Sequence, residues 1–280
     1  MISKRVQNTA LAVGVYRAWE HRLPAQTRLF DDPVIEHLLS GVYGLVARNG
    51  LARRIAARVL EAYAPGVCGG VVCRTRAIDE ATCEAIAAGA TQIVVLGAGM
   101  DTRPYRLAQM SGVTVWELDV PDVLAAKRAS LTRALGRVPG NVRYLSVDLT
   151  AGTLAEALAA DGFDPDVQTL LLCEGVSMYL PRDAVEQILA FAGTMAAGSR
   201  FVFTYFLQSV FESARLAKAV ERYEWLSGFD PEQLAGLFAE RGLDLVEDIG
   251  AEDYEKRYLR PRNRSLPVYA LERQAVAEIG

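Results

Sequence analysis

The sequence predicts an α/β protein with a seven-stranded, mostly parallel sheet that helices cover on both faces. Short apolar runs alternate with helical stretches from residue 92 to the end of the chain, and this alternation is typical of βαβ units. The run Ile93 to Leu96 leads into Gly97-Ala98-Gly99 and then into a polar helix start. Such a strand–turn–helix unit brings backbone close to a nucleotide-like ligand.

Hydrophobic periodicity and turn residues give the expected elements in order. Strands are expected at 92–97, 113–119, 141–147, 167–174, 199–206, 242–249 and 265–272, the last after an Arg-rich loop at 257–264. Helices are expected near 71–89, 103–110, 121–135, 151–160, 182–196 and 230–240. No internal repeat or low-complexity linker interrupts the series, which favours one domain over residues 1–280.

The regions outside this alternating core are expected to cover its ligand-binding edge. Residues 1–65 have a helical pattern, in which Asp32-Pro33 starts one helix and Pro65-Gly66 ends another. We expect 1–65 to form a helical cap, 66–206 the cofactor-binding core, 207–228 a lid insertion and 229–280 the rest of the sheet. Cap and lid should lie at the carboxyl ends of the strands, where open α/β sheets bind ligands.

Composition excludes several classes of partner. The net charge of −4 offers no general attraction to nucleic acid, and the basic clusters 48–58 and 257–264 are interpreted as solvated faces. No apolar run approaches the ~18 residues of a membrane span, and no signal peptide is recognised, so no membrane partner is expected. The cysteines lack Cys-x-x-Cys spacing and only two histidines occur, which predicts no metal site and a reduced, cytoplasmic location.

The glycine turn leaves two adenosine-bearing cofactors to choose between, a dinucleotide and S-adenosylmethionine. A dinucleotide turn needs a third small residue under the pyrophosphate, and this chain has Thr102 at that position. No Gly-x-x-x-x-Gly-Lys-Ser/Thr or Tyr-x-x-x-Lys pattern occurs, and the turn follows a long N-terminal region. S-adenosylmethionine has no phosphate, so the shorter turn suffices. The sequence favours S-adenosylmethionine.

Three carboxylates end apolar strands and are candidates for holding that cofactor. Asp119 could accept hydrogen bonds from both ribose hydroxyls, or could cap the helix that begins at Pro121. Asp148 could accept from the adenine amino group while Leu149 packs beside the ring, or could cap the helix near 151. Glu174 follows an apolar strand and needs a partner, because burying an unpaired carboxylate is costly.

Five ordered blocks of sequence resemble the leucine carboxyl methyltransferase family, and its bacterial branch of tetracenomycin-type polyketide O-methyltransferases in particular. The blocks are Arg74-Thr75-Arg76-Ala77-Ile78-Asp79, Leu96 to Arg103, Glu117-Leu118-Asp119-Val120-Pro121, Val147-Asp148-Leu149 and Leu172 to Pro181. The resemblance is strong over residues 70 to 195 and loose over the first sixty. It implies the class I S-adenosylmethionine-dependent methyltransferase fold, in which the final strand is antiparallel.

The resemblance also implies roles for individual residues. Glu174 would bind the cofactor's ammonium group, and Arg76, the second arginine of Arg-Thr-Arg, would bind its carboxylate with a two-pronged match. Spacing alone favours Arg74 and Arg76 facing water. Asp101 and Arg103 are expected to order the glycine turn, with Gly97, Ala98 and Gly99 touching the cofactor. Tyr179 either shapes the methyl-transfer pocket or is an ordinary core or rim tyrosine.

The scarcity of histidine bears on the methyl acceptor. A carboxylate is ionised at neutral pH and needs no base, whereas a phenol of pKa ~10 would benefit from one. His21 and His37 are the only histidines, and both precede the core. This favours a carboxylate acceptor, although Asp, Glu or Tyr could act as base and either histidine could reach in through the cap. Arg17, Arg28 or Arg215 could position an acidic substrate, and the sequence does not choose among them.

The expected function is therefore S-adenosylmethionine-dependent O-methylation of a small-molecule carboxylate, such as an aromatic polyketide acid. The alternatives are methylation of a phenolic hydroxyl, methylation of a protein's C-terminal carboxylate, and a cofactor-binding protein that has lost transfer activity. The sequence leaves the substrate, the pathway and the oligomeric state open.

Overall fold

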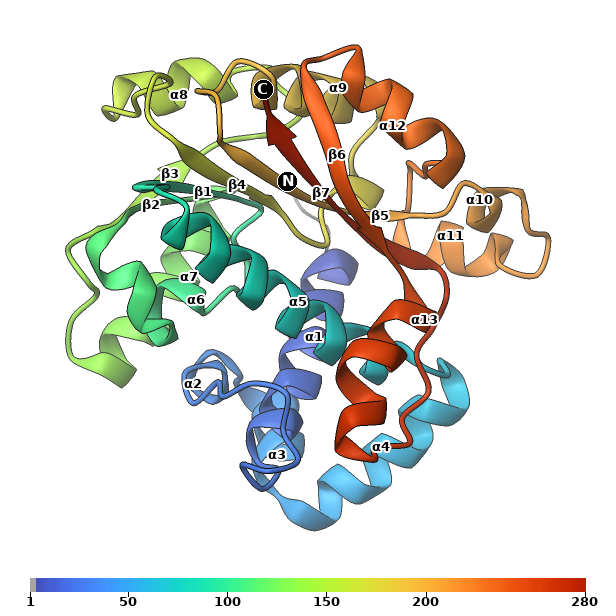
Figure 1. Cartoon of the computed structure of the whole chain (residues 1–280). Coiled ribbons are helices and arrows are strands. Elements are labelled where there is room, and N and C mark those ends of the chain that lie inside the picture. The colour runs from blue at the N-terminus through green and yellow to red at the C-terminus, as the bar shows by residue number, and fades with distance from the viewer. Residues whose placement is uncertain (1–3) are drawn as a thin grey trace.

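A computed structural model describes residues 4–280, and its sheet has the predicted architecture (Figure 1). Seven strands in the described chain follow the order β3-β2-β1-β4-β5-β7-β6. Their bounds are β1 (Gln92–Leu96), β2 (Thr114–Asp119), β3 (Val142–Ser146), β4 (Thr169–Cys173), β5 (Arg200–Phe206), β6 (Leu243–Ile249) and β7 (Glu272–Ile279). Only β7 is antiparallel to its neighbours, β5 and β6, while the other described pairs are parallel. The predicted fold class is confirmed.

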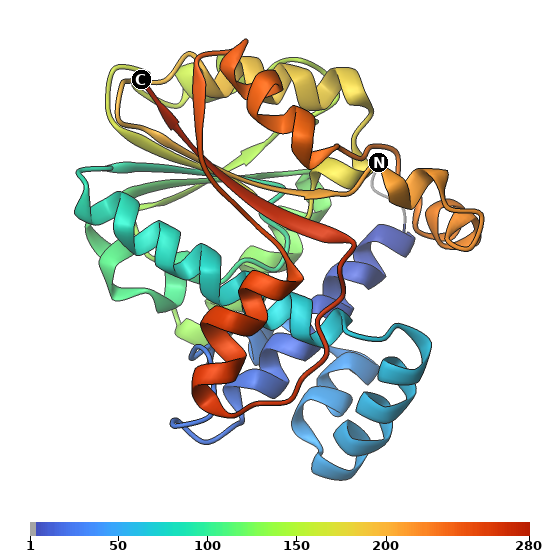
Figure 2. The ribbon, with the colours of Figure 1, turned by 45° about the vertical axis from the view of Figure 1, so that its right-hand side comes forward.

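Helices pack on both faces of this sheet (Figures 1 and 2). One face carries α5 (Val67–Ala87), α6 (Arg103–Arg106) and α7 (Pro121–Leu135), and the other carries α8 (Leu154–Ala160), α9 (Arg182–Ala192) and α12 (Pro231–Ala239). The central strands β1 and β4 are buried along their whole length. Because both of their faces are covered, these strands are continuous apolar runs without polar alternation.

The N-terminal segment is helical, as expected. It contains α1 (Lys4–His21), α2 (Ile35–Leu38), α3 (Gly41–Arg48) and α4 (Gly50–Tyr63). Asp32 Oδ1 accepts a hydrogen bond from Ile35 N at the start of α2. Gly66, in the left-handed region at φ +80°, separates α4 from α5.

Residues 207–228 form two short helices beside the sheet, α10 (Ser209–Glu212) and α11 (Ala217–Tyr223). They pack on a small apolar cluster around Met178, Phe206 and Val210, and lie at the edge of the molecule next to β5 (Figure 2). The role of this segment as a lid, and the division of the chain into cap, core and lid, stay predictions.

The last predicted strand, 265–272, was placed too early, because β7 begins only at Glu272. Residues 265–271 instead run along α5, where Tyr269 N donates to Gly66 O at 3.1 Å. A Cβ on Gly69 would come within 2.0 Å of the carbonyl oxygen of Pro267. The apolar character of this segment therefore reflects packing on a helix rather than a place in the sheet.

Two smaller predictions also need correction. The stretch 257–264, expected to be a loop, is largely helical, since α13 (Ala251–Tyr254) continues into η3 (Glu255–Leu259) and η4 (Arg260–Arg262). The helix expected at 103–110 is divided into α6 and η1 (Ala108–Gly112), because Leu107 between them has an extended backbone.

No single helix in the described chain is long and apolar enough to cross a membrane. The consecutive helices α4 and α5 reach the required length and composition only when taken together, and they are bent by 100° at their junction.

Candidate active site

Three predicted site residues lie in one row at the carboxyl edge of the sheet. Leu96 of β1 is paired with Leu118 of β2 and with Cys173 of β4. The residues that follow these three, Gly97, Asp119 and Glu174, therefore leave neighbouring strands at the same level. Since adjacent strands lie about 4.8 Å apart, the structure brings the glycine turn between the two carboxylates.

The glycine turn approaches the row with backbone alone. Gly97 and Gly99 both have positive φ, +60° and +27°, a conformation that side chains disfavour. A Cβ on Gly97 would lie 2.4 Å from Val176 Cγ2. A Cβ on Gly99 would meet nothing closer than 3.6 Å and would lie 3.9 Å from Asp119 Oδ2. A side chain at position 99 would therefore occupy the space next to the Asp119 carboxylate.

Asp119 is fixed by backbone donors on both sides. Its Oδ2 accepts from Gly99 N at 2.8 Å and its Oδ1 from Val120 N at 2.7 Å. Burial raises the pKa of Asp119, against the two N–H groups that lower it. Helix α7 receives no side-chain cap, so the alternative role as N-cap is not seen. Each oxygen retains a lone pair for a further donor.

Asp148 lies two residues beyond Ser146, which pairs with Asp119 across β2 and β3. The Asp148 carboxylate is exposed, and its Oδ1 accepts from the backbone N and the hydroxyl of Thr150 at 2.9 and 2.7 Å. These bonds hold the pKa of Asp148 below its usual value. Helix α8 begins only at Leu154, so Asp148 does not cap it. Leu149 is half-buried against the core beside it.

Glu174 accepts hydrogen bonds from two arginines, one on each carboxylate oxygen. Arg74 Nε donates to its Oε1 at 2.9 Å, and Arg103 Nη1 donates to its Oε2 at 2.7 Å. Burial would raise the pKa of Glu174, but Arg103 and Arg74 outweigh it and the net shift is downward. The carboxylate is therefore ionised near neutral pH and still has lone pairs to offer.

Arg103 links this carboxylate to the start of α6. It is 1% exposed and donates to Asp79 and Asp101 at 2.8 Å each. Asp101 also accepts from Arg103 N at 2.8 Å, so this pair orders the helix start as expected. The Nη2 of Arg103 is buried without a hydrogen-bond partner in the described chain. Such an orphaned donor is costly unless a ligand completes it.

In the structure Arg74 contacts Glu174, whereas Arg76, the residue expected from the sequence, does not, so Arg74 becomes the candidate for the cofactor's carboxylate. Two residues along a helix turn the side chain by about 200°, so the two arginines face opposite sides. Arg76 is partly exposed and pairs with Glu80 at 2.6 Å. Arg74 is 6% exposed and donates to Glu272 as well as to Glu174.

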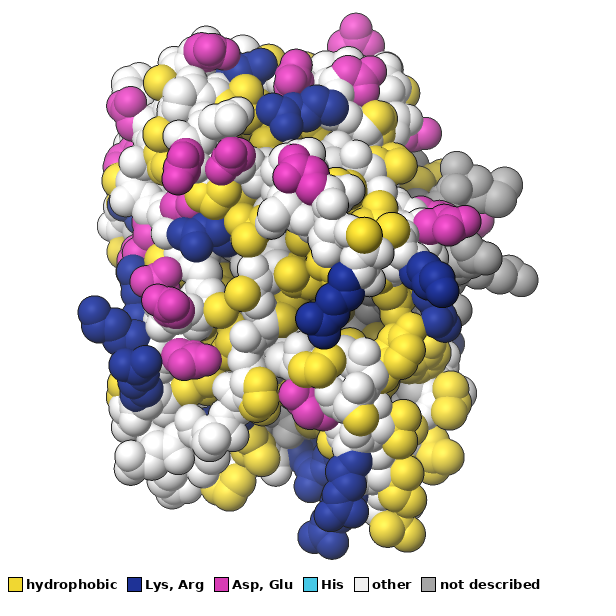
Figure 3. Space-filling view, turned by 90° about the vertical axis from the view of Figure 1, so that its right-hand side faces the viewer, with side chains coloured by type: hydrophobic (Ala, Val, Ile, Leu, Met, Phe, Trp, Pro, Cys, Tyr) yellow, Lys and Arg dark blue, Asp and Glu magenta, His cyan; other side chains and the backbone are white. Residues whose placement is uncertain are grey.

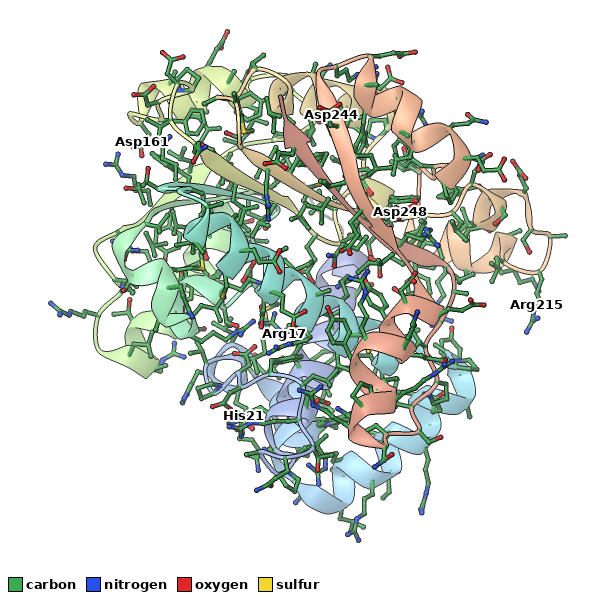
Figure 4. The ribbon with its side chains drawn as sticks, in the orientation of Figure 1. Arg17, His21, Asp161, Arg215, Asp244 and Asp248 are labelled. Atoms are coloured by element: carbon green, nitrogen blue, oxygen red, sulfur yellow. The ribbon has the colours of Figure 1, made fainter. Side chains whose placement is uncertain are left out.

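Arg17, expected as a substrate-positioning residue, is instead part of the scaffold. It is buried and donates to Met100 O, Asp32 Oδ2 and Thr102 Oγ1 at 2.8, 2.5 and 2.5 Å. Figure 4 shows Arg17 inside the molecule and Arg215 at its outer edge. Arg28 pairs with Asp31 at 3.1 Å. Arg17 therefore ties the cap to the end of the glycine turn.

Both histidines lie away from the row of site residues. His21 Nδ1 is 2.6 Å from Asp31 Oδ1, and His37 is exposed on α2. Tyr179 lies in η2 (Ser177–Tyr179), the turn that follows Glu174, and packs with the apolar cluster under α10 and α11. Burial raises the pKa of Tyr179. No group of three or more potential metal ligands occurs in the described residues.

Arg74 and Glu272 were not predicted from the sequence to contribute to this cluster of charges. A signal for the arginine was available, because Arg76 and Glu80 have the i, i+4 spacing of an exposed helix pair. Arg74 shares its helix face with Ile78, which is fully buried. Nothing in the sequence indicated that Glu272, so distant along the chain, would contact Arg74.

The sequence model of leucine carboxyl methyltransferases matches residues 10–193, well over half of the chain. The chain belongs to the leucine carboxyl methyltransferase family. Similar proteins bear the name of S-adenosyl-L-methionine-dependent methyltransferases: one from Mycobacteroides abscessus is 32% identical over 94% of this chain and 91% of its own length, and one from Saccharopolyspora erythraea is 36% identical over 88% and 77%. The protein is thus an S-adenosylmethionine-dependent methyltransferase.

Solved structures agree with the fold of this methyltransferase. A crystal structure assigned to a methyltransferase from Thermobifida fusca has a TM-score of 0.59 and 19% identity, covering 88% of this chain and 93% of the other. A DUF574 family protein from Streptomyces avermitilis has a TM-score of 0.58 and 18% identity over 82% and 91%. At this identity the likeness concerns the fold alone.

The chemistry of these residues suits the groups of the cofactor. Asp119, next to the bare backbone of Gly99, has free lone pairs of the kind that ribose hydroxyls require. The ionised Glu174 suits an ammonium group, and the orphaned Nη2 of Arg103 suits a carboxylate. Arg74 Nη2 lies 3.8 Å from where a Cβ on Gly175 would be.

Proposed function

We infer that this methyltransferase transfers the methyl group to a carboxylate oxygen of a small molecule, an aromatic acid of the polyketide type. The observation that carries the inference is the position of the imidazoles. His21 is engaged with Asp31, and His37 faces solvent on α2. A methyl acceptor that is already ionised when it binds needs no imidazole to act as a general base.

The other ionisable groups around the site support the same conclusion. Glu174 already accepts from two arginines and would be a weak base, because the arginines lower its pKa. Tyr179 is held protonated by its raised pKa, so its hydroxyl would act as a hydrogen-bond donor to the acceptor. A donor stabilises a bound carboxylate, whereas a phenol would need its proton removed.

The chain's part in the reaction is then alignment and exclusion of water. The bound cofactor supplies a methyl group already activated by its sulfonium. Asp119 and the glycine turn would fix the nucleoside, while Glu174, Arg74 and Arg103 would fix the amino-acid end. Holding donor and acceptor in line lowers the entropic part of the barrier, and α10 and α11 would keep the acceptor oxygen from being hydrated.

An aromatic wall next to Tyr179 supports an aromatic acceptor. The rings of Phe206 and Trp225 meet edge to face with centroids 4.5 Å apart, and Tyr223 stacks on Trp225 at 5.3 Å. Leu226 N donates to Met178 O at 2.7 Å, which fastens the end of the lid segment to the turn that bears Tyr179. Aromatic faces favour flat apolar ligands.

The test is transfer from methyl-labelled S-adenosylmethionine to a matched panel. The panel contains aromatic acids, the corresponding phenols without a carboxyl group, and a peptide that ends in a free leucine carboxylate. Products are then treated with mild alkali, which hydrolyses methyl esters and leaves aryl ethers intact. Alkali-labile label on the acids is expected. Alkali-stable label on the phenols would replace the proposal by phenol methylation, and label on the peptide alone would indicate a protein acceptor.

A further inference from the structure

The outward faces of α3 and α4 carry an unusual concentration of exposed apolar side chains. Six of the nine large hydrophobic residues that are exposed in the described chain lie there, between 56% and 69% exposed. They are Val42, Leu45, Leu51, Ile55, Val59 and Tyr63, which we call the α3–α4 outer face. Figure 3 shows hydrophobic side chains reaching the surface along the lower edge of the molecule, next to Lys and Arg side chains.

The pattern along α4 forms a continuous stripe. Leu51, Ile55, Val59 and Tyr63 recur every four residues, so they line one side of the helix. None of the residues of α4 is fully buried. Asn49 caps the helix through bonds to Leu51 N and Ala52 N at 3.0 Å each. Asn49 therefore starts α4, and the Leu51, Ile55 and Val59 side chains of its stripe are exposed, while Tyr63 at its end contacts Arg222 of α11.

Charge on α3 and α4 is predominantly positive. The two helices contain Arg48, Arg53, Arg54 and Arg58 against the single acidic residue Glu61, in a chain of net charge −4. Arg54 and Arg58 are exposed on the same side as the stripe, and no ion pair in the described part of the chain neutralises them. Exposed arginines and exposed apolar residues thus share this face.

We propose that the α3–α4 outer face docks on an anionic lipid surface, with its apolar stripe inserted among the acyl chains and its arginines on lipid phosphates. An amphipathic helix of this composition lies in the plane of a membrane interface, and each basic residue adds attraction to anionic lipid. A second copy of the chain fits less well, since a two-fold contact through this face would oppose arginines with arginines.

The docked face adjoins the lid segment. Arg222 Nη1 of α11 donates to the hydroxyl of Tyr63 at the end of α4, at 2.7 Å. Lipid contact at α4 would therefore lie next to the segment that covers the acceptor side of the site. This part of the proposal concerns location only and does not depend on the identity of the methyl acceptor.

The experiment is flotation of the full-length protein with two kinds of vesicle, pure phosphatidylcholine and phosphatidylcholine with about a third phosphatidylglycerol. We expect flotation only with the anionic vesicles, and at least a tenfold weakening when salt is raised from about 0.05 to 0.5 M, because salt screens surface charge. Leu51→Ser/Ile55→Ser and Arg54→Gln/Arg58→Gln should each abolish flotation. The matched controls Arg133→Gln/Arg137→Gln and Val246→Ser change exposed residues elsewhere and should float like the wild type.

All the substituted side chains of the face are exposed, so each variant is expected to fold. The thermal unfolding curve of each variant checks this. The proposal would be overturned if the protein floated equally well with both vesicle types. It would also be overturned if the variants of the α3–α4 outer face floated as well as the control variants. A dimer in light scattering that Leu51→Ser/Ile55→Ser converts to monomer would assign the face to a second copy instead. Binding to soluble polyglutamate without binding to anionic vesicles would assign it to an acidic protein.

Discussion

Lys127 and Glu117 form an ion pair inside the protein, directly behind the glycine turn. Lys127 Nζ lies 2.9 Å from Glu117 Oε1 and also donates to the carbonyl oxygen of Ala98 at 2.8 Å. Both side chains are almost completely buried. A buried pair rarely repays its desolvation through stability alone. We interpret it as the support that keeps the turn in the conformation that directs Gly99 N to Asp119.

We predict that Lys127→Met weakens the binding of S-adenosylhomocysteine on the order of tenfold, since a hydrogen bond from a charged group contributes roughly 1.5–3 kcal/mol. Calorimetry measures this affinity, and Lys218→Met on the lid is the control. Lys127→Arg, which keeps the charge, should recover part of the loss. Unchanged affinity in a folded Lys127→Met protein would show that the turn is rigid without this support.

The same pair predicts how stability depends on pH. Burial raises the pKa of Glu117 from 4.5 to about 7, although Lys127 opposes the shift. A carboxyl whose pKa is higher in the folded state contributes stability below its unfolded pKa and loses it as pH rises through the folded pKa. The free energy of unfolding of the wild type, relative to Glu117→Gln, should therefore fall as pH rises from about 5 to about 8. Urea titrations at several pH values measure this difference, and the exposed Glu240→Gln should show no such trend. A difference that grows with pH would mean that the ion pair dominates over burial.

The choice between the two arginines of α5 can be tested directly. Arg74→Lys should weaken S-adenosylhomocysteine binding about tenfold or more, because Lys cannot reproduce the fork that reaches Glu174 and Glu272. Arg76→Lys should change the affinity by less than about twofold, since exposed ion pairs contribute little. The opposite ranking would restore the sequence-based assignment of Arg76.

Asp119 is predicted to be the main ribose acceptor. Asp119→Ala should lower cofactor affinity by roughly tenfold to a hundredfold, the usual effect of losing a charged acceptor. The control is Asp122→Ala, which changes an exposed aspartate three residues later in the first turn of α7. Burial raises the pKa of Asp119. As the pH is lowered, the affinity of the wild type for S-adenosylhomocysteine should therefore begin to fall at a higher pH than it would for an aspartate of ordinary pKa. A folded Asp119→Ala protein with wild-type affinity contradicts the assignment.

The base-free mechanism predicts that neither histidine is needed for transfer to a carboxylate. His21→Ala and His37→Ala should keep kcat within about threefold of the wild type, because the acceptor is already ionised. Thermal unfolding is measured in parallel, since His21 contacts Asp31 and its loss could loosen the cap. A drop of about a hundredfold in kcat for either folded variant, at unchanged cofactor affinity, would bring phenol methylation to the front.

The sequence by itself determined six of the seven strands and the row of residues at their carboxyl ends. Apolar runs that end in Gly97, Asp119 and Glu174 identify strands and their carboxyl ends. Parallel strands bring those ends to one edge of the sheet, so the three residues had to meet. The alternation of strands and helices fixed the fold class for the same local reason, because the period of the apolar pattern is read one segment at a time.

Only the tertiary structure decided which charged groups surround that row. Arg74 is 198 residues from Glu272 along the chain, and Arg17 is 85 residues from Thr102. Contacts of this kind depend on how cap, core and final strand pack, and no local pattern specifies them. The start of β7 depended on packing in the same way, since Pro267 and Tyr269 lie on the glycines of α5. Local periodicity therefore predicts which segments become strands or helices, while the partners of buried charges follow from long-range packing that must satisfy each of them.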